Sequence, residues 1–323
     1  MSDESVHPGQ TGSSQFPLVS ILVPSYNHDP YVIDCLESIK HLSYQRLELI
    51  VSDDCSNDQT FEVAQEWVQR NSNRFERCLV VRQNKNVGLL SNLQYLFDDA
   101  HGVYLAYIAS DDVFIESAIS ERVNIMEQDP DVDAVFGNAQ AISVDGTLLQ
   151  EEYIPRRIQR ELASRKLMVV SLLLQFRLPG PVMMLRKNAV LEGGSLGKLP
   201  LDLHSEDIYI FTRLASLGKL RYSGSVVAKY RIAVPGGMNW TYSSRHLEQF
   251  IKSYEKNRHL LTGFNRFVLN CRTARYKAEL ANGKGFFSMV RLIALRSVLL
   301  LMRTVVFAAA LFNPLAARQE HCK

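Results

Sequence analysis

The chain has 323 residues, 46% of them hydrophobic and 22% charged, and this composition excludes wholesale disorder. The length suffices for one large α/β domain with an appendage, or for two domains. The net charge of +2 hides an asymmetry, because residues 1–240 carry 22 Lys and Arg against 30 Asp and Glu, whereas residues 241–323 carry 14 against 4. The basic C-terminal part predicts an anionic partner, either a membrane surface or nucleic acid.

Five cysteines are scattered along the chain without C-x-x-C spacing. An odd, scattered set argues against a disulfide framework or a zinc site and predicts a reducing compartment. Residues 1–16 are polar and contain Gly, Ser and Gln, so we expect a disordered tail and no signal peptide.

The first part of the chain alternates apolar, β-rich segments with segments of helical periodicity. The predicted strands are 18–23, 47–51, 78–81 and 103–108, and the predicted helices between them are 31–39, 61–68 and 89–96. This alternation predicts a parallel sheet with helices on both faces.

Polar loops follow all four strands, at residues 24–27, 53–54, 84–88 and 111–112. Ligands of open α/β sheets bind at this edge, so we expect one crevice there. Adjacent carboxylates after a buried strand, such as Asp111 and Asp112, are costly unless something positive neutralises them. A Mg²⁺ or Mn²⁺ ion that holds a phosphate suits such ligands. The alternative is that Ser110 or Asp111 caps a helix near Ile115.

The rest of the chain adds shorter strands and more helices. The pattern predicts a helix through 119–126, strands at 134–136 and 141–144 with a hairpin turn at 145–146, a basic and then apolar helical segment over 156–175, a strand at 181–185, a helix from 206 to 217, and strands at 220–222 and 226–230. Beyond residue 242 the chain becomes helical and basic.

The motifs resemble those of the family 2 inverting glycosyltransferases of O-antigen, capsule and exopolysaccharide assembly, which have the GT-A fold. The matching pieces are VSILVPSYN (19–27), ELIVSDDCSNDQT (48–60), NKNVGLLSN (84–92), YIASDD (107–112) and HSEDIYIFTRLASLG (204–218). The resemblance implies an α/β, Rossmann-like nucleotide-diphospho-sugar transferase domain with a mixed sheet flanked by helices over 17–240. A basic helical region over 241–323 follows it.

The resemblance also implies roles for individual residues. The residues implied to bind the UDP-sugar are Pro24, Tyr26, Asp53, Asp54, Asn86, Asn92, Asp111 and Arg231. Asp112, with Asp111, would bind Mn²⁺ or Mg²⁺ bridging both phosphates, as Lewis-acid help to the leaving UDP. Asp207 would be the general base for the acceptor hydroxyl, with Glu206 as the alternative. The competing explanation for Glu206 and Asp207 is the preference of a helix N-terminus for acids.

Some residues depart from the family pattern or stand outside it. Many members carry a further Asp where this chain has Ala109, which puts the tightness of metal binding in question. The Gln-x-x-Arg-Trp signature of processive synthases is absent, so we expect one sugar to be added per acceptor. The isolated His28, His101 and His204 are expected to be surface or loop residues.

Residues 286–312 are very apolar but are interrupted by Arg291, Arg296 and Arg303. The uncharged run after Arg303 is shorter than the ~20 residues that span a bilayer. Arg296 and Arg303 are seven residues apart and share one helix face, which predicts an amphipathic helix on an anionic membrane surface. The alternatives are a helix packed on the catalytic domain or in a homodimer interface, and a spanning helix, which the arginines disfavour.

Together these features predict a cytoplasmic enzyme, peripheral on the inner face of the cytoplasmic membrane. It would move one sugar from a UDP-sugar to a polyprenyl-diphosphate-linked saccharide, with no nucleic-acid partner. A nucleotidyltransferase would need a glycine-rich phosphate loop after the first strand, and residues 24–30 contain no glycine. An NAD-binding protein would need G-x-G-x-x-G, which is also missing. A non-catalytic, membrane-docked nucleotide-sugar-binding protein remains the other alternative.

Overall fold

The computed structural model describes residues 16–176, 178–232, 244–281 and 286–311. Its centre is one mixed sheet in the order β3-β2-β1-β4-β8-β6-β9-β5, with β7 paired to β6. The strands are β1 (Val19–Ser25), β2 (Leu47–Asp53), β3 (Arg77–Arg82), β4 (Tyr104–Tyr107), β5 (Val113–Phe114), β6 (Ala134–Ile142), β7 (Leu148–Gln150), β8 (Met183–Arg186) and β9 (Leu220–Arg231). The first four strands run parallel, as predicted, and β8 is antiparallel to both β4 and β6.

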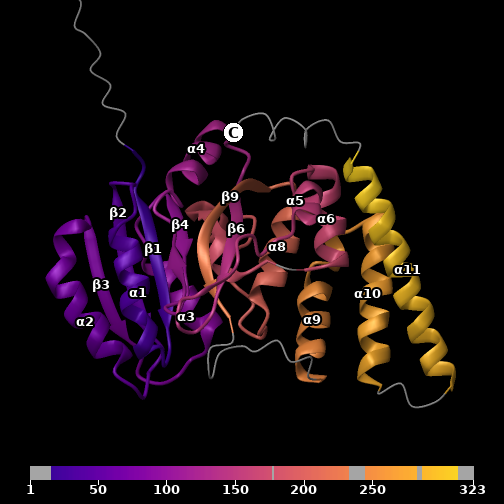
Figure 1. Cartoon of the computed structure of the whole chain (residues 1–323), viewed down its shortest axis with the longest axis horizontal. Helices are drawn as coiled ribbons and strands as arrows, with labels where there is room; N and C mark the ends of the chain where they lie inside the picture. Colours follow the sequence, from indigo (N-terminus) through magenta and orange to yellow (C-terminus); the bar gives the residue numbers. More distant parts are fainter. Residues whose placement is uncertain (1–15, 177, 233–243, 282–285, 312–323) are drawn as a thin grey trace, which may run out of the picture.

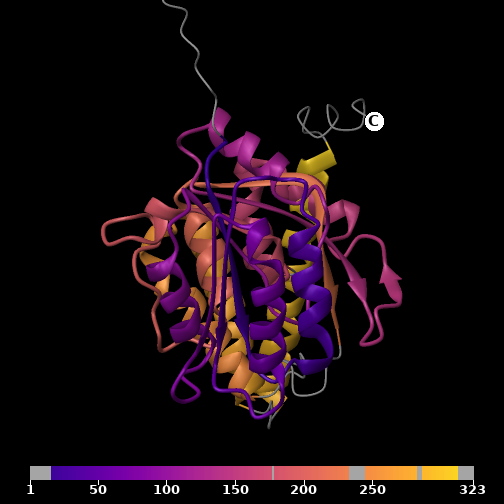
Figure 2. The ribbon, with the colours of Figure 1, turned by 90° about the vertical axis from the view of Figure 1, so that its left-hand side faces the viewer.

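Strands β1, β2 and β4 form the interior of the N-terminal half, whereas β3 is half-buried at the edge of the sheet. Every residue of β1, β2 and β4 is buried, as expected where helices cover both faces of a parallel sheet. The helices of this half are α1 (Asp29–Lys40), α2 (Thr60–Asn71) and α3 (Leu89–Asp99), and helices lie on either side of this part of the sheet (Figure 2). Helix α4 (Ser120–Gln128) packs against β6 and β9. The buried face of α1, with Val32, Leu36 and Ile39, has the spacing expected of an amphipathic helix.

Two pairs of short predicted strands are single strands in the structure. Segments 134–136 and 141–144 belong largely to β6, and 220–222 and 226–230 both belong to β9. The two strands run parallel to each other, with register shifts beside Asn138 that accommodate the break in each pattern. A Cβ on Gly137 would lie 2.6 Å from the Ser225 carbonyl oxygen, so only glycine allows this close approach.

The alternative that Ser110 or Asp111 caps a helix near Ile115 is wrong. The chain continues from Asp112 into β5, which pairs with β9, and the next helix begins only at Ser120. The two carboxylates therefore lie between two strands and cannot satisfy the N–H groups of a helix.

Helices dominate the remainder of the chain and gather at the opposite end of the molecule from β3 (Figure 1). They are α5 (Arg156–Leu162), α6 (Arg165–Leu174), α7 (Lys187–Val190), α8 (Glu206–Ser216), α9 (Ser244–Lys256), α10 (Gly263–Leu280) and α11 (Phe286–Leu311), with 3₁₀ turns at Ser72–Arg74, Gly180–Val182 and Arg258–Leu260. The long helix α11 packs against α10, α6 and α5.

Helix α11 has one packed face and one exposed face. Leu299, Met302, Val306 and Ala310 are buried at helical spacing, so the predicted alternative of packing on the catalytic domain holds for this face. The exposed face is also apolar, with Ile293, Leu300, Leu301, Val305 and Leu311 all more than half exposed. By length and composition, Leu292–Leu311 is the one helix in the described parts of the chain that meets the requirement for crossing a membrane, with 20 residues and a mean hydropathy of 2.0.

Candidate functional site

A pocket of about 490 Å³ lies at the carboxyl ends of β1, β2 and β4. Ten of the eleven predicted site residues line it: Pro24, Tyr26, Asp54, Asn86, Asn92, Asp111, Asp112, Glu206, Asp207 and Arg231. We call this cavity the donor pocket. The four polar loops therefore meet in one crevice, as the strand order predicts.

Asp53 is the predicted residue that the structure does not bring to the donor pocket. It is fully buried, its Oδ2 accepts the Ser56 N–H at 2.9 Å, and its Oδ1 accepts the Ser56 hydroxyl. Successive side chains of a strand point to opposite faces, so Asp53 and Asp54 cannot both point into the pocket. Asp53 instead fixes the turn in which Cys55 has a φ of 63°.

Asp54 points the other way and ties the loop 84–88 to the end of β2. Its two carboxylate oxygens accept the N–H groups of Val87 at 2.7 Å and Gly88 at 2.9 Å. Burial nonetheless raises the pKa of the Asp54 carboxyl, because these two hydrogen bonds offset the lost hydration only in part. Asn92 hydrogen-bonds both the backbone carbonyl and the hydroxyl of Ser52, and so anchors α3 to the same strand.

Arg231 holds the Asp111–Asp112 pair in place. Its backbone N–H donates to Asp112 Oδ1 at 2.8 Å, and its Nε donates to the Asp111 carbonyl oxygen at 2.8 Å. The guanidinium also donates to the Val144 carbonyl at 2.9 Å and lies over the Tyr31 ring at 4.8 Å. Only 2% of the Arg231 side chain is exposed. These contacts indicate that Arg231 fixes the Asp112 carboxylate and the Asp111 backbone in position.

Asp112 is almost completely buried, at 2% exposure. Burial raises the pKa of its carboxyl well above the ordinary value, and the neighbouring charge of Asp111 raises it further, while Arg231 acts in the opposite direction. Such a group is stabilised when a proton or a cation binds it.

His28 is a loop residue, as predicted, but it also lines the donor pocket, which the sequence did not indicate. Its Nδ1 lies 2.9 Å from the Ser110 hydroxyl and 3.7 Å from Asp111 Oδ1. It directly precedes α1 and follows the turn after β1, and β1 pairs with β4. The sequence feature that could have placed His28 at the site is its position directly after the Pro-Ser-Tyr-Asn turn.

Three tyrosines that the sequence did not single out also line the donor pocket, namely Tyr107, Tyr153 and Tyr230. Burial raises the pKa of Tyr107, with further contributions from the charges of Glu206 and Asp207. The rings of Tyr153 and Tyr230 meet edge to face with centroids 5.4 Å apart. They give one wall of the pocket the aromatic character that suits a sugar ring.

Glu206 and Asp207 open α8 and also line the donor pocket, so the helix N-terminus and the site coincide. Asp207 Oδ1 accepts the Ile208 N–H at 2.7 Å. Burial raises the pKa of Asp207 to about 6, and burial together with the Asp207 charge raises that of Glu206 to about 8. One proton shared by the two carboxyls is therefore favoured near neutral pH.

No group of three or more His, Cys, Asp or Glu side chains is placed to hold a metal within the described ranges. Asp111 and Asp112 supply two carboxylates at the pocket, and Ala109 supplies no side-chain oxygen there. Magnesium is commonly bound by one or two carboxylates plus the phosphates of a substrate. The pair therefore fits a metal ion shared with a diphosphate, and does not form an all-protein metal site.

The glycosyl transferase family 2 model matches residues 20–191, which include the first four strands and the Asp111–Asp112 pair. The chain belongs to glycosyl transferase family 2.

Curated relatives support this membership. The glycosyltransferase GlyG of Streptococcus pneumoniae serotype 4 is 31% identical over 121 residues, which cover 38% of each chain. The putative teichuronic acid biosynthesis glycosyltransferase TuaG of Bacillus subtilis is 32% identical over 110 residues, which cover 34% of this chain and 42% of TuaG. The matched stretches span about two fifths of the length of these relatives.

Known structures share the fold of this family 2 member. Staphylococcus aureus TarS 1-349 in complex with UDP-GlcNAc superposes with a TM-score of 0.59 at 16% identity, covering 86% of this chain and 79% of that one. Mannosyltransferase PcManGT from Pyrobaculum calidifontis, in complex with GDP-Man and Mn²⁺, gives a TM-score of 0.57 at 18% identity, covering 95% and 87%. The predicted α/β fold of the GT-A type, a mixed sheet flanked by helices, is confirmed.

Proposed function

We propose that this chain is an inverting glycosyltransferase that moves one sugar from a UDP-sugar to an acceptor hydroxyl of a lipid-linked saccharide. The observation that carries the proposal is the donor pocket, in which the carboxylates at the strand ends meet the Glu206–Asp207 pair of α8. The UDP-GlcNAc bound to TarS supports a UDP-sugar donor. The GDP-Man and Mn²⁺ bound to PcManGT support a nucleotide-sugar and a divalent metal.

The nucleoside would lie over the ends of β1 and β2. Asp54 would accept the uracil imide N–H, since a carboxylate oxygen can accept more than the single backbone N–H that each already receives. Pro24, Tyr26 and Asn86 line the same end of the pocket and would enclose the base and ribose.

Asp111 and Asp112 would hold Mn²⁺ or Mg²⁺ together with the donor diphosphate. When bound, the ion supplies positive charge that stabilises the departing UDP. The Arg231 N–H on Asp112 Oδ1 fixes the orientation of this carboxylate before the donor arrives.

Asp207 would remove the proton of the acceptor hydroxyl while the oxygen of that hydroxyl forms a bond to the anomeric carbon of the donor sugar. The bond from that carbon to the UDP oxygen breaks on the opposite face, so the configuration inverts. The protonated Glu206 avoids a second negative charge beside the base. The ring pair of Tyr153 and Tyr230 would support the acceptor sugar.

The test is a screen for nucleotide release, with UDP-sugars and GDP-sugars, a short lipid-diphosphate-sugar acceptor, and parallel reactions with a chelator. We expect release of UDP from one UDP-sugar and its loss when the metal is chelated. Release only from a GDP-sugar would overturn the choice of donor, and a product that retains the anomeric configuration would overturn the mechanism.

The region 241–323 would place this enzyme on a membrane, with the domain 17–240 carrying the chemistry. The exposed apolar face of α11 supports an interfacial position.

The double substitution Leu300→Glu/Leu301→Glu is expected to lower co-sedimentation with anionic vesicles several-fold, because both leucines are over 60% exposed. The matched control is Leu191→Glu/Leu201→Glu, which adds the same charges at exposed leucines outside α11. Equal losses in both variants would contradict the assignment of α11.

A further inference from the structure

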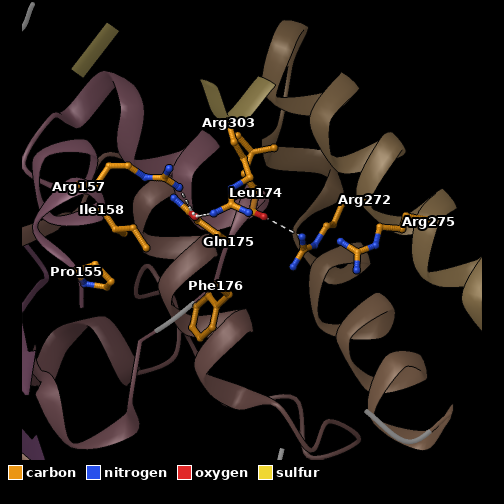
Figure 3. Close-up of a pocket in the computed structure, with 9 residues that line it drawn as sticks. All are labelled: Pro155, Arg157, Ile158, Leu174, Gln175, Phe176, Arg272, Arg275 and Arg303. Carbon is orange, nitrogen blue, oxygen red and sulfur yellow. Dashed lines mark hydrogen bonds between the residues drawn. The ribbon is translucent and has the colours of Figure 1, made fainter. Parts of the chain in front are cut away.

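A second pocket, of about 360 Å³, lies between α5, the end of α6, α10 and α11. Four of its lining residues are arginines, namely Arg157, Arg272, Arg275 and Arg303, and no Asp or Glu from the described part of the chain lines it. We call it the arginine pocket. Figure 3 shows the arginine side chains of α5, α10 and α11 around it, with Gln175 and Leu174 between them.

The arginines are brought together largely by neutral oxygens. Arg303 Nη2 and Arg157 Nη2 both donate to Gln175 Oε1, at 2.5 and 3.4 Å (Figure 3). Arg272 Nη1 donates to the Leu174 carbonyl oxygen at 2.8 Å. A single amide oxygen that receives two guanidinium groups holds two positive charges close together without neutralising either.

Acidic side chains of the described chain lie near the arginine pocket but do not line it. Arg275 pairs with Glu279 at 3.0 Å, but the same Glu279 oxygen also accepts Arg296 at 2.9 Å. Buried Glu161 accepts the Gln175 amide, and so orients the amide oxygen toward the arginines. Like charges around one hollow favour a bound anion, and the fork of a guanidinium matches phosphate oxygens in geometry.

The arginine pocket lies next to the donor pocket along two chain segments. Tyr153 lines the donor pocket and Pro155 the arginine pocket; likewise Leu178 lines the former and Phe176 the latter. Each pair is two residues apart, which corresponds to at most about 7 Å of extended chain. The Phe176 ring also packs on Phe211 of α8, the helix that begins with Glu206 and Asp207.

On its other side the arginine pocket borders α11. Phe307 of α11 packs against the Arg157 guanidinium at 5.3 Å, and Arg303 comes from the same helix. The exposed side of this helix is apolar, with Leu300 and Leu301 over 60% exposed. The order from α11 to Asp207 is thus the exposed apolar face of α11, then the arginine pocket, then the donor pocket. A molecule with a hydrocarbon chain, a diphosphate and a sugar has its parts in the same order.

We propose that the arginine pocket binds the diphosphate group of a lipid-linked saccharide acceptor, so that the attached sugar reaches Asp207. This inference rests on the proposed glycosyltransferase function and names the part of the acceptor that the enzyme recognises. The guanidinium groups would contact the diphosphate oxygens, and the lipid chain would continue along the exposed face of α11.

The test measures binding of farnesyl diphosphate to the full chain by calorimetry, with saturating UDP and Mg²⁺ so that the donor pocket is occupied. The variants are Arg157→Gln, which changes an exposed residue, and Arg157→Gln/Arg275→Gln. We expect the Kd to rise about threefold or more in the single variant and tenfold or more in the double variant. The control is Arg156→Gln, an exposed neighbour on α5 that does not line the pocket and should leave the Kd unchanged.

Further measurements distinguish a lipid diphosphate from other phosphate-containing ligands. They also distinguish failure of the pocket assignment from failure of the proposed function. Inorganic diphosphate should compete more weakly than farnesyl diphosphate, and phosphatidylglycerol vesicles should not displace the probe. Displacement by these vesicles would assign the pocket to bulk lipid headgroups and overturn the proposal, as would an unchanged Kd in Arg157→Gln. If UDP-sugar turnover is normal while the variants bind the probe like the wild type, the pocket assignment alone fails. If the variants lose the probe but no UDP-sugar is turned over, the proposed function alone fails.

Discussion

The donor pocket, lined by Tyr153 and Leu178, and the arginine pocket, lined by Pro155 and Phe176, are neighbours of opposite charge. Five carboxylates line the former, against Arg231 and His28, whereas four arginines and no acid of the described chain line the latter. Burial raises the pKa values of Asp112, Glu206 and Asp207, so the donor pocket favours protons and cations. This difference agrees with the two proposals, in which a metal-bound nucleotide would occupy the donor pocket and the diphosphate of the acceptor the arginine pocket.

The largest effect is expected from the base. Asp207→Asn should lower kcat by about 10²- to 10⁴-fold with little change in the donor KM, because it removes only proton transfer. The matched control is Glu206→Gln, which mimics the protonated form that the raised pKa of Glu206 favours and should cost less than tenfold. Steady-state kinetics of both variants, with thermal unfolding to verify folding, checks the assignment. A larger loss in Glu206→Gln would exchange the two roles.

The next effect concerns the metal. Asp112→Asn should weaken metal-dependent donor binding about tenfold or more, since a neutral amide is a poorer ligand for a hard cation. The same change should raise the Tm of the metal-free protein by a few degrees, because it removes a buried carboxyl while the amide oxygen can still accept the Arg231 N–H. Calorimetry with UDP and Mn²⁺ measures the first effect and thermal unfolding the second. A lowered Tm with unchanged donor binding would make Asp112 a structural residue.

The pH dependence of kcat/KM distinguishes the two carboxyls without a substitution. A base must be ionised, and burial raises the pKa of Asp207 to about 6. The rate should therefore rise about tenfold per pH unit below pH 6 and level off above it. If Glu206 were the base, the rise would continue to about pH 8. Glu206→Gln should leave the profile unchanged.

Much of the donor pocket could be predicted from the sequence, because buried strands have recognisable periodicity and parallel strands place their following loops at one edge. The sequence could not show which of Asp53 and Asp54 points into the donor pocket, because that depends on the turn at Cys55. His28 was missed because its contact with Ser110 depends on the pairing of β1 with β4, a long-range feature.

The arginine pocket was not predictable by the same route. Its arginines are spread over residues 157–303 on α5, α10 and α11, and each looks like an ordinary polar position within its own helix. Only the packing of the helices around Gln175 brings the charges together.

The smallest effect on donor affinity is expected at Asp53. Substitutions of Asp53 and of its neighbour Asp54 test whether only the Asp54 side chain points into the donor pocket. Asp53→Asn should lower the free energy of unfolding by about 1–3 kcal/mol, because an NH₂ group replaces one of the two oxygens that separately accept the N–H and the hydroxyl of Ser56. Its affinity for UDP should stay within about twofold, since Asp53 does not line the donor pocket. Asp54→Asn is the matched variant: it likewise loses one of two backbone N–H acceptors, but it should also weaken UDP binding about tenfold. Denaturant unfolding and calorimetry with UDP measure both quantities. Equal losses of UDP affinity would mean that the turn at 54–56, and not the direction of one side chain, determines nucleotide binding.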